Sequence, residues 1–168
     1  IHVVLLELVI DPTCSIIFER MPAEPNIMSR PPRRRSESVL SRFILMKSII
    51  QGLVIFAAGA SAILFLRNTG VTPEEIRSFM LFYLVMANFF LVYVNASELE
   101  SVFRIIFEWR DKTVWCINGA VVALPLLLIF TPFGNMLART EPFCIRHLMY
   151  AVGIALCAAG WYELVKLF

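Results

Sequence analysis

Two carboxylates stand four residues apart near the start of the chain, inside an otherwise apolar run. Glu7 and Asp11 belong to the segment from Ile1 to Phe18, which is typical of a membrane-spanning helix. At this spacing the two side chains share one helix face. Each charge would cost roughly 2.5–3.5 kcal/mol at the centre of a lipid-facing helix. The pattern therefore predicts that this face meets protein or water.

Pro12 directly follows the second acid and adds to its chemistry. A proline has no amide hydrogen and its ring displaces a carbonyl one turn back, so the oxygen of Leu8 is freed beside the carboxylates. Such an oxygen-rich group of ligands suits calcium, sodium or protons. The segment is therefore predicted to be a cation-binding element of a transporter.

The composition indicates a membrane protein. Hydrophobic residues make up 59% of the chain, charged residues 17%, and the mean hydropathy is +0.76, whereas soluble domains are about half apolar and a quarter charged. The net charge of +2 by itself says nothing about a nucleic-acid partner. A basic run without interleaved aromatic residues is formed by Arg33, Arg34 and Arg35. We therefore expect membrane lipids as partners and no nucleic acid. The chain opens in mid-helix without a signal-peptide pattern, which favours part of a longer protein.

The expected fold is an all-α membrane protein, a bundle of five transmembrane helices forming one domain over residues 1–168. The five apolar segments have about the length that crosses a bilayer. They cover residues 1–18, 43–66, 76–94, 114–130 and 147–168. Proline and arginine make 19–38 a solvated loop, 131–146 is expected to be a short loop, and the amphipathic stretch 97–112 is expected to lie on the membrane surface.

Basic residues predict the orientation. With loop 19–38 in the cytoplasm, most of the 15 lysines and arginines fall on that side. This positive-inside bias places the N-terminus outside and the C-terminus in the cytoplasm.

Small and polar residues predict helix packing. Ala151, Ala155 and Ala159 recur every four residues, a spacing that lets membrane helices approach closely, although general alanine richness would look the same. Asn88 and Asn95 share a face, and a buried asparagine more often joins helices than binds an ion. Four cysteines without close pairs argue against a site for soft metals and imply no disulfide.

The first part of the chain resembles the P-type cation-transporting ATPases, closest to their calcium-pump-like branch. The resemblance to the sixth transmembrane helix and the following cytoplasmic loop rests on Glu7-Leu8-Val9-Ile10-Asp11-Pro12, on Phe18-Glu19, and on Asn26-Ile27-Met28-Ser29-Arg30-Pro31-Pro32-Arg33. The branch has a similar Met-x-Arg-Pro-Pro-Arg loop. The five-helix layout and the ending from Glu163 to Phe168 resemble the same family's helices six to ten, so the resemblance covers nearly the whole chain.

The resemblance implies which residues bind the cation and how many cations the site can hold. In the family the sixth helix unwinds and supplies oxygen ligands at the positions of Glu7 and Asp11, and the eighth helix supplies an asparagine at Asn88. Pumps that carry two calcium ions have a glutamate where this chain has Val85, so at most one calcium site is expected here. The family's fourth helix, which supplies further ligands, is not in this chain, and neither is its fifth.

The resemblance also implies that ATP and Mg²⁺ act only in domains outside this chain, which alone should not hydrolyse ATP. The tripeptide Asp111-Lys112-Thr113 matches the start of the family's phosphorylation motif Asp-Lys-Thr-Gly-Thr, but Val114 and Trp115 follow it at the foot of a membrane helix. The match is interpreted as accidental.

The sequence therefore predicts the C-terminal membrane domain of an ATP-driven cation pump. Its partners would be membrane lipids, the N-terminal part of the pump and the transported cation, Ca²⁺ or another hard cation. One alternative is a stand-alone membrane scaffold derived from a pump. A secondary transporter is the other, but no second Glu-x-x-x-Asp-Pro segment marks an internal repeat.

Overall fold

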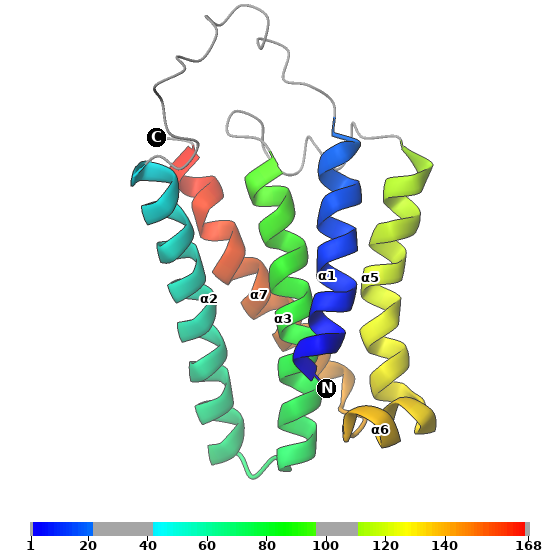
Figure 1. The fold of residues 1–168 in the computed structure, drawn as a ribbon. Helices are drawn as coiled ribbons and strands as arrows, with labels where there is room; N and C mark the ends of the chain where they lie inside the picture. The colour runs from blue at the N-terminus through cyan, green and yellow to red at the C-terminus, as the bar shows by residue number, and fades with distance from the viewer. Residues whose placement is uncertain (1, 22–41, 97–110, 167–168) are drawn as a thin grey trace, which may run out of the picture.

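The computed structural model describes residues 2–21, 42–96 and 111–166, and these ranges contain six helices and no strand (Figure 1). Five of the helices are long and one is short. They are α1 (His2–Glu19), α2 (Arg42–Asn68), α3 (Pro73–Ala96), α5 (Lys112–Phe130), α6 (Pro132–Ala138) and α7 (Ile145–Lys166).

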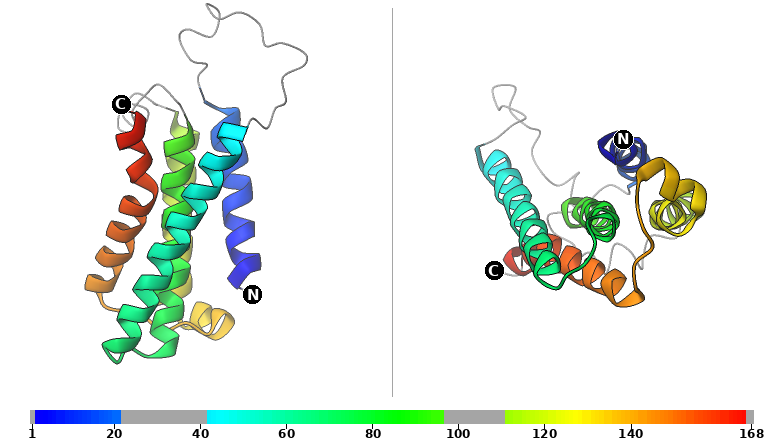
Figure 2. Two further views of the ribbon diagram at one scale, coloured as in Figure 1. Left: turned by 90° about the vertical axis from the view of Figure 1, so that its left-hand side faces the viewer. Right: turned by 90° about the horizontal axis from the view of Figure 1, so that it is seen from below.

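α3 is the central helix of the bundle. It contacts α1, α2, α5 and α7, and the view along the bundle shows α1 and α7 on opposite sides of it (Figure 2). The start of α1 and the end of α7 lie at opposite ends of the bundle (Figure 1), as an odd number of long helices requires.

The central place of α3 shows in its burial. Phe79, Phe82, Tyr83 and Met86 of α3 are each 4% exposed or less. The one polar group among them is satisfied, because the Tyr83 hydroxyl donates to the Ile55 carbonyl of α2 at 2.8 Å. α3 therefore supplies more of the described core than any other helix.

The small residues predicted to allow close packing lie where they were expected. Ala151, Ala155 and Ala159 of α7 are fully buried, and Ala62 of α2 joins the same core. α7 packs against both α2 and α3. Side chains this short let the helix backbones approach closely, so the predicted packing role is confirmed.

The predicted helices agree with α1, α2, α3, α5 and α7 to within about three residues at each end that the structure describes. By length and composition, three described helices could cross a membrane: α2, α3 and α5. The predicted number of five spans is therefore not matched in the described residues, because α1 and α7 are not among the three. α1 contains Glu7, Asp11 and Glu19, and α7 ends in Glu163 and Lys166.

The loop predicted over 131–146 was wrong in one respect, because it contains α6. Thr131 caps this helix by accepting a hydrogen bond from the Gly134 amide at 3.2 Å, and Pro132 occupies its first turn. A threonine followed by proline is a helix-start signal, but this one does not precede a long apolar run. The predicted surface stretch at 97–112 and the loop 19–38 lie almost wholly outside the described residues.

Gly59 lies at a close contact between α2 and α3, which leads to a stability prediction. A Cβ at Gly59 would lie 3.0 Å from Cε1 of Tyr83 and 3.1 Å from Cε of Met80, whereas one at Gly52 of the same helix meets nothing within 4 Å. We expect Gly59→Leu to force the helices apart and to lower the free energy of unfolding by about 1–3 kcal/mol.

The matched control is Gly52→Leu, which gains helix propensity without a clash and is expected to be neutral or stabilising by less than about 1 kcal/mol. Thermal unfolding of both variants in one detergent measures the difference. Equal melting temperatures would contradict the tight contact at Gly59.

Candidate cation-binding site

α1 packs on one face only. Ile17 is 1% exposed and joins a core cluster with Val92 and Tyr93 of α3 and Val114 of α5. Ile10, about two turns earlier, lies on the same packed face. The apolar side of α1 therefore faces α3 and α5.

A neighbouring face of α1 is open and carries both predicted carboxylates. Glu7 and Asp11 are exposed, and with them Val4 and Phe18, which are 65% and 48% exposed. Their sequence numbers place these four residues on one helix face. A face that combines two acids with large apolar side chains suits neither lipid nor bulk water, so it is the part of α1 expected to meet further protein.

Pro12 does not break α1, which continues as one helix from His2 to Glu19. The proline still removes the amide that would bond the Leu8 carbonyl. α1 is therefore not unwound in this conformation, although the family resemblance implied that it would be. The Leu8 carbonyl nevertheless lacks its usual backbone donor.

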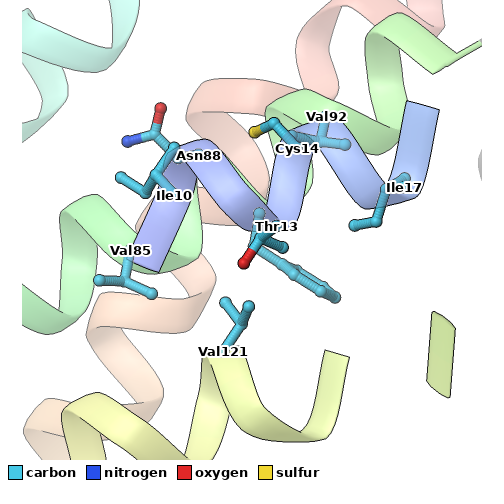
Figure 3. Close-up of a pocket in the computed structure, with 9 residues that line it drawn as sticks. Ile10, Thr13, Cys14, Ile17, Val85, Asn88, Val92 and Val121 are labelled. Carbon is cyan, nitrogen blue, oxygen red and sulfur yellow. The ribbon is translucent and has the colours of Figure 1, made fainter. Parts of the chain in front are cut away.

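Asn88, the third predicted ligand, lies at the boundary of α3 and α1. Its Nδ2 donates to the Leu84 carbonyl at 2.9 Å. It borders a cavity of about 10 Å³ between α1, α3 and α5, together with Val85 of α3 and with Ile10, Thr13 and Cys14 of α1 (Figure 3). A space of this size is at the lower limit for one water molecule, so it does not hold a hydrated cation.

The three predicted ligands thus lie on two neighbouring faces of α1. Asn88 adjoins its packed face, while Glu7 and Asp11 occupy its open face. Across residues 2–21, 42–96 and 111–166, no group of three or more His, Cys, Asp or Glu side chains could hold a metal ion. In the described part of the chain, the two carboxylates predicted as ligands lie near each other without the further groups of a complete coordination sphere.

Other polar side chains join helices to one another. Asn95 donates to Oε1 of Gln51 in α2 at 3.3 Å, as predicted for a buried asparagine. The hydroxyl of Tyr93 and the amide of Asn118 bond α3 to α5 at 2.6–2.8 Å. Sequence reasoning missed the second pair, because nothing in either segment shows that the two side chains meet.

Glu163 and Lys166 form an ion pair at the end of α7. Lys166 Nζ lies 2.7 Å from Oε1 of Glu163 and also donates to the Val94 carbonyl of α3 at 2.6 Å. The ammonium group therefore ties the end of α7 to the end of α3.

Asp111 has a structural role that explains the motif-like tripeptide. It is the N-cap of α5, accepting from the Thr113 amide at 2.9 Å, and it pairs with Arg20 at the end of α1 at 2.7 Å. The hydrogen bond from Arg20, followed by that from Thr113, lowers the pKa of the Asp111 carboxyl below its ordinary value. The residue caps one helix and ties it to another.

We expect Asp111→Asn to leave ATP turnover of any longer protein that contains this chain unchanged, since asparagine also caps helices well. The ion pair with Arg20 is solvent-exposed and weak. Its contribution to stability is fully present above the ordinary pKa of about 3.9 and is lost as the pH falls through the lower folded value. Melting temperatures of variant and wild type should therefore differ slightly at neutral pH and converge in acid. Loss of turnover in a well-expressed variant would contradict this role.

Comparison with known proteins gives one family. Residues 1–168 match the family model described as "Cation transporting ATPase, C-terminus". The match extends over the whole chain, including both carboxylates of α1 and the buried face of α3.

Individual relatives are distant in sequence. The chain is 22% identical over 148 residues to calcium-transporting ATPase type 2C member 1 of Homo sapiens, a match that covers 86% of this chain and 16% of that protein. It is 24% identical over 134 residues to calcium-transporting ATPase 1 of Yarrowia lipolytica, covering 80% and 14%. The chain therefore spans only a small part of the length of these relatives.

Proposed function

This chain belongs to the family of cation-transporting ATPase C-terminal domains, and from that membership we propose that it is the membrane domain of an ATP-driven pump and supplies two carboxylate ligands, Glu7 and Asp11, to the transported cation. Ca²⁺ is the proposed cation. The names of the two relatives support this choice, and calcium prefers carboxylate and carbonyl oxygens.

The open face of α1 is the observation that supports the proposal. Both acids are exposed there, on a helix whose other face is packed. Ionised carboxylates in a membrane helix are costly unless they meet partners. Under the proposal, helices from the rest of the pump cover this face, and their oxygens together with the Leu8 carbonyl complete the coordination of the ion.

The proposed mechanism is a change in ion affinity between two states. The ion binds Glu7 and Asp11 from the cytoplasmic side, and phosphorylation of a domain outside this chain favours a conformation in which α1 holds the ion less tightly. The helices α2, α3, α5 and α7 act as a platform. Asn88, which lies against α1, joins the coordination sphere only if α1 turns relative to α3.

Val85 sets the proposed stoichiometry. Its side chain is buried and borders the cavity beside Asn88, where it offers no oxygen. A second calcium ion would need an acidic ligand on this part of α3, so the pump is proposed to bind at most one. We also propose the orientation that the distribution of basic residues indicates, in which α1 starts outside and α7 ends in the cytoplasm.

The mass of the native product tests the proposal against a stand-alone scaffold. An antibody raised to residues 19–38 is used on membranes of the source cells. A band several times heavier than 19.1 kDa, which forms a phosphoenzyme with ATP and calcium, is the expected result. A band of 19.1 kDa alone would contradict it and leave a scaffold.

A further inference from the structure

A second cavity lies on the other side of the bundle, between α2, α3 and α7. Its volume is about 580 Å³, within the roughly 300–1,000 Å³ of pockets that take apolar ligands. Phe79 and Ala62 form its buried floor, while Phe65 and Tyr150 at its edges are 64% and 51% exposed. This groove is open to the surroundings and nearly all its lining is apolar.

The groove is separate from the proposed ion site. α1, with its two carboxylates, lies on one side of α3, and α7 lies on the other (Figure 2). Helices that cover the acids of α1 would therefore leave the groove facing lipid. Unfilled, its lining side chains would lose dispersion contacts, so a flexible apolar chain from the bilayer is the occupant that fits this surface.

Charge at the mouth of the groove specifies the kind of lipid. Arg146 is exposed and stands one helix turn before Tyr150, on the same face of α7. It makes no ion pair within the described residues. A guanidinium group binds a phosphate through two hydrogen bonds. We propose that the groove binds one phospholipid, with an acyl chain against Phe65, Phe79 and Tyr150 and the phosphate at Arg146.

A photoactivatable phospholipid tests the proposal. Membranes that contain the full-length chain are loaded with a phosphatidylcholine carrying a diazirine on one acyl chain, and crosslinked peptides are mapped by mass spectrometry. Crosslinks should concentrate on residues 61–66 and 150–154. An even distribution along the exposed apolar face of α2, including Leu53 and Phe56, would mean ordinary bilayer contact and would overturn the proposal.

Filling the groove should displace the lipid. Ser61 lines it, whereas Leu64 of the same helix is 62% exposed and does not. In Ser61→Trp, crosslinking should fall about tenfold, the loss expected if roughly two buried methylenes are displaced. Leu64→Trp should crosslink as wild type does. Ile154→Trp fills the groove from α7 and replaces Ser61→Trp if that variant does not fold.

The phosphate contact has its own matched pair. Arg146→Gln should lower crosslinking several-fold. Arg67→Gln should not, because this exposed arginine at the end of α2 lies on the helix face turned away from the groove residues Ser61 and Phe65. Equal crosslinking in both variants would overturn the headgroup assignment. Capture of another protein at residues 61–66 in place of the lipid would overturn the proposal as a whole. Neither result bears on calcium transport, so the two proposals fail separately.

Discussion

Asp11→Asn is expected to abolish calcium-dependent phosphorylation of the intact pump while leaving its expression and folding unchanged. The substitution keeps the size of the side chain and removes the charge on which a calcium ligand depends. Asp11 is exposed on the open face of α1 and lines neither of the two cavities described above, so its substitution leaves no void in either of them.

Glu19→Gln is the matched control, since it removes a carboxylate from the end of the same helix. The Glu19→Gln pump should form phosphoenzyme at the same calcium concentrations as the wild type. Phosphorylation from ATP is measured in isolated membranes across a series of calcium concentrations. A normal calcium-stimulated phosphoenzyme in Asp11→Asn would remove this residue from the site.

The second large effect is on stability, at the junction of α5 and α6. A Cβ at Gly134 would overlap the backbone of Leu128, including its carbonyl group. That carbonyl also accepts from Thr140 Oγ1 at 3.5 Å. Backbone atoms held on both sides cannot move aside as a flexible side chain does. We expect Gly134→Ala to lower the free energy of unfolding by about 3 kcal/mol, at the upper end of overpacking costs.

Gly119→Ala provides the comparison within α5, because a Cβ there meets nothing within 4 Å. It should be neutral or stabilising by up to about 1 kcal/mol. Both variants are unfolded by heat in the same detergent and followed by circular dichroism. If Gly134→Ala and Gly119→Ala have the same melting temperature, α6 does not approach α5 this closely in solution.

The long helices were predictable because lipid selects for continuous apolar runs of a fixed length. α2 and α3 illustrate this, each agreeing with its predicted segment to within three residues. α6 was missed because seven residues are too few to form an apolar run. Its start signal, Thr131 followed by Pro132, is local. The surrounding glycine and proline residues are typical of a loop, which is what was predicted.

The site was predictable only in part. The spacing of Glu7 and Asp11 correctly placed both acids on one face, since helix geometry fixes that relation. The sequence could not tell which neighbour each face of α1 meets, and hence that Ile17 packs inward while the acids remain exposed. That depends on how α1 packs against α3 and α5, which is set by contacts between segments far apart in the chain.

The role of Glu7 and Asp11 as ligands is tested most directly by counting calcium ions. Equilibrium binding of radioactive Ca²⁺ to the intact pump, without ATP, is scaled to the number of phosphorylation sites. The wild type should bind at most one ion per site, because Val85 offers no ligand, and Asp11→Asn should bind none. Two bound ions in the wild type, or unchanged binding in Asp11→Asn, would contradict the account.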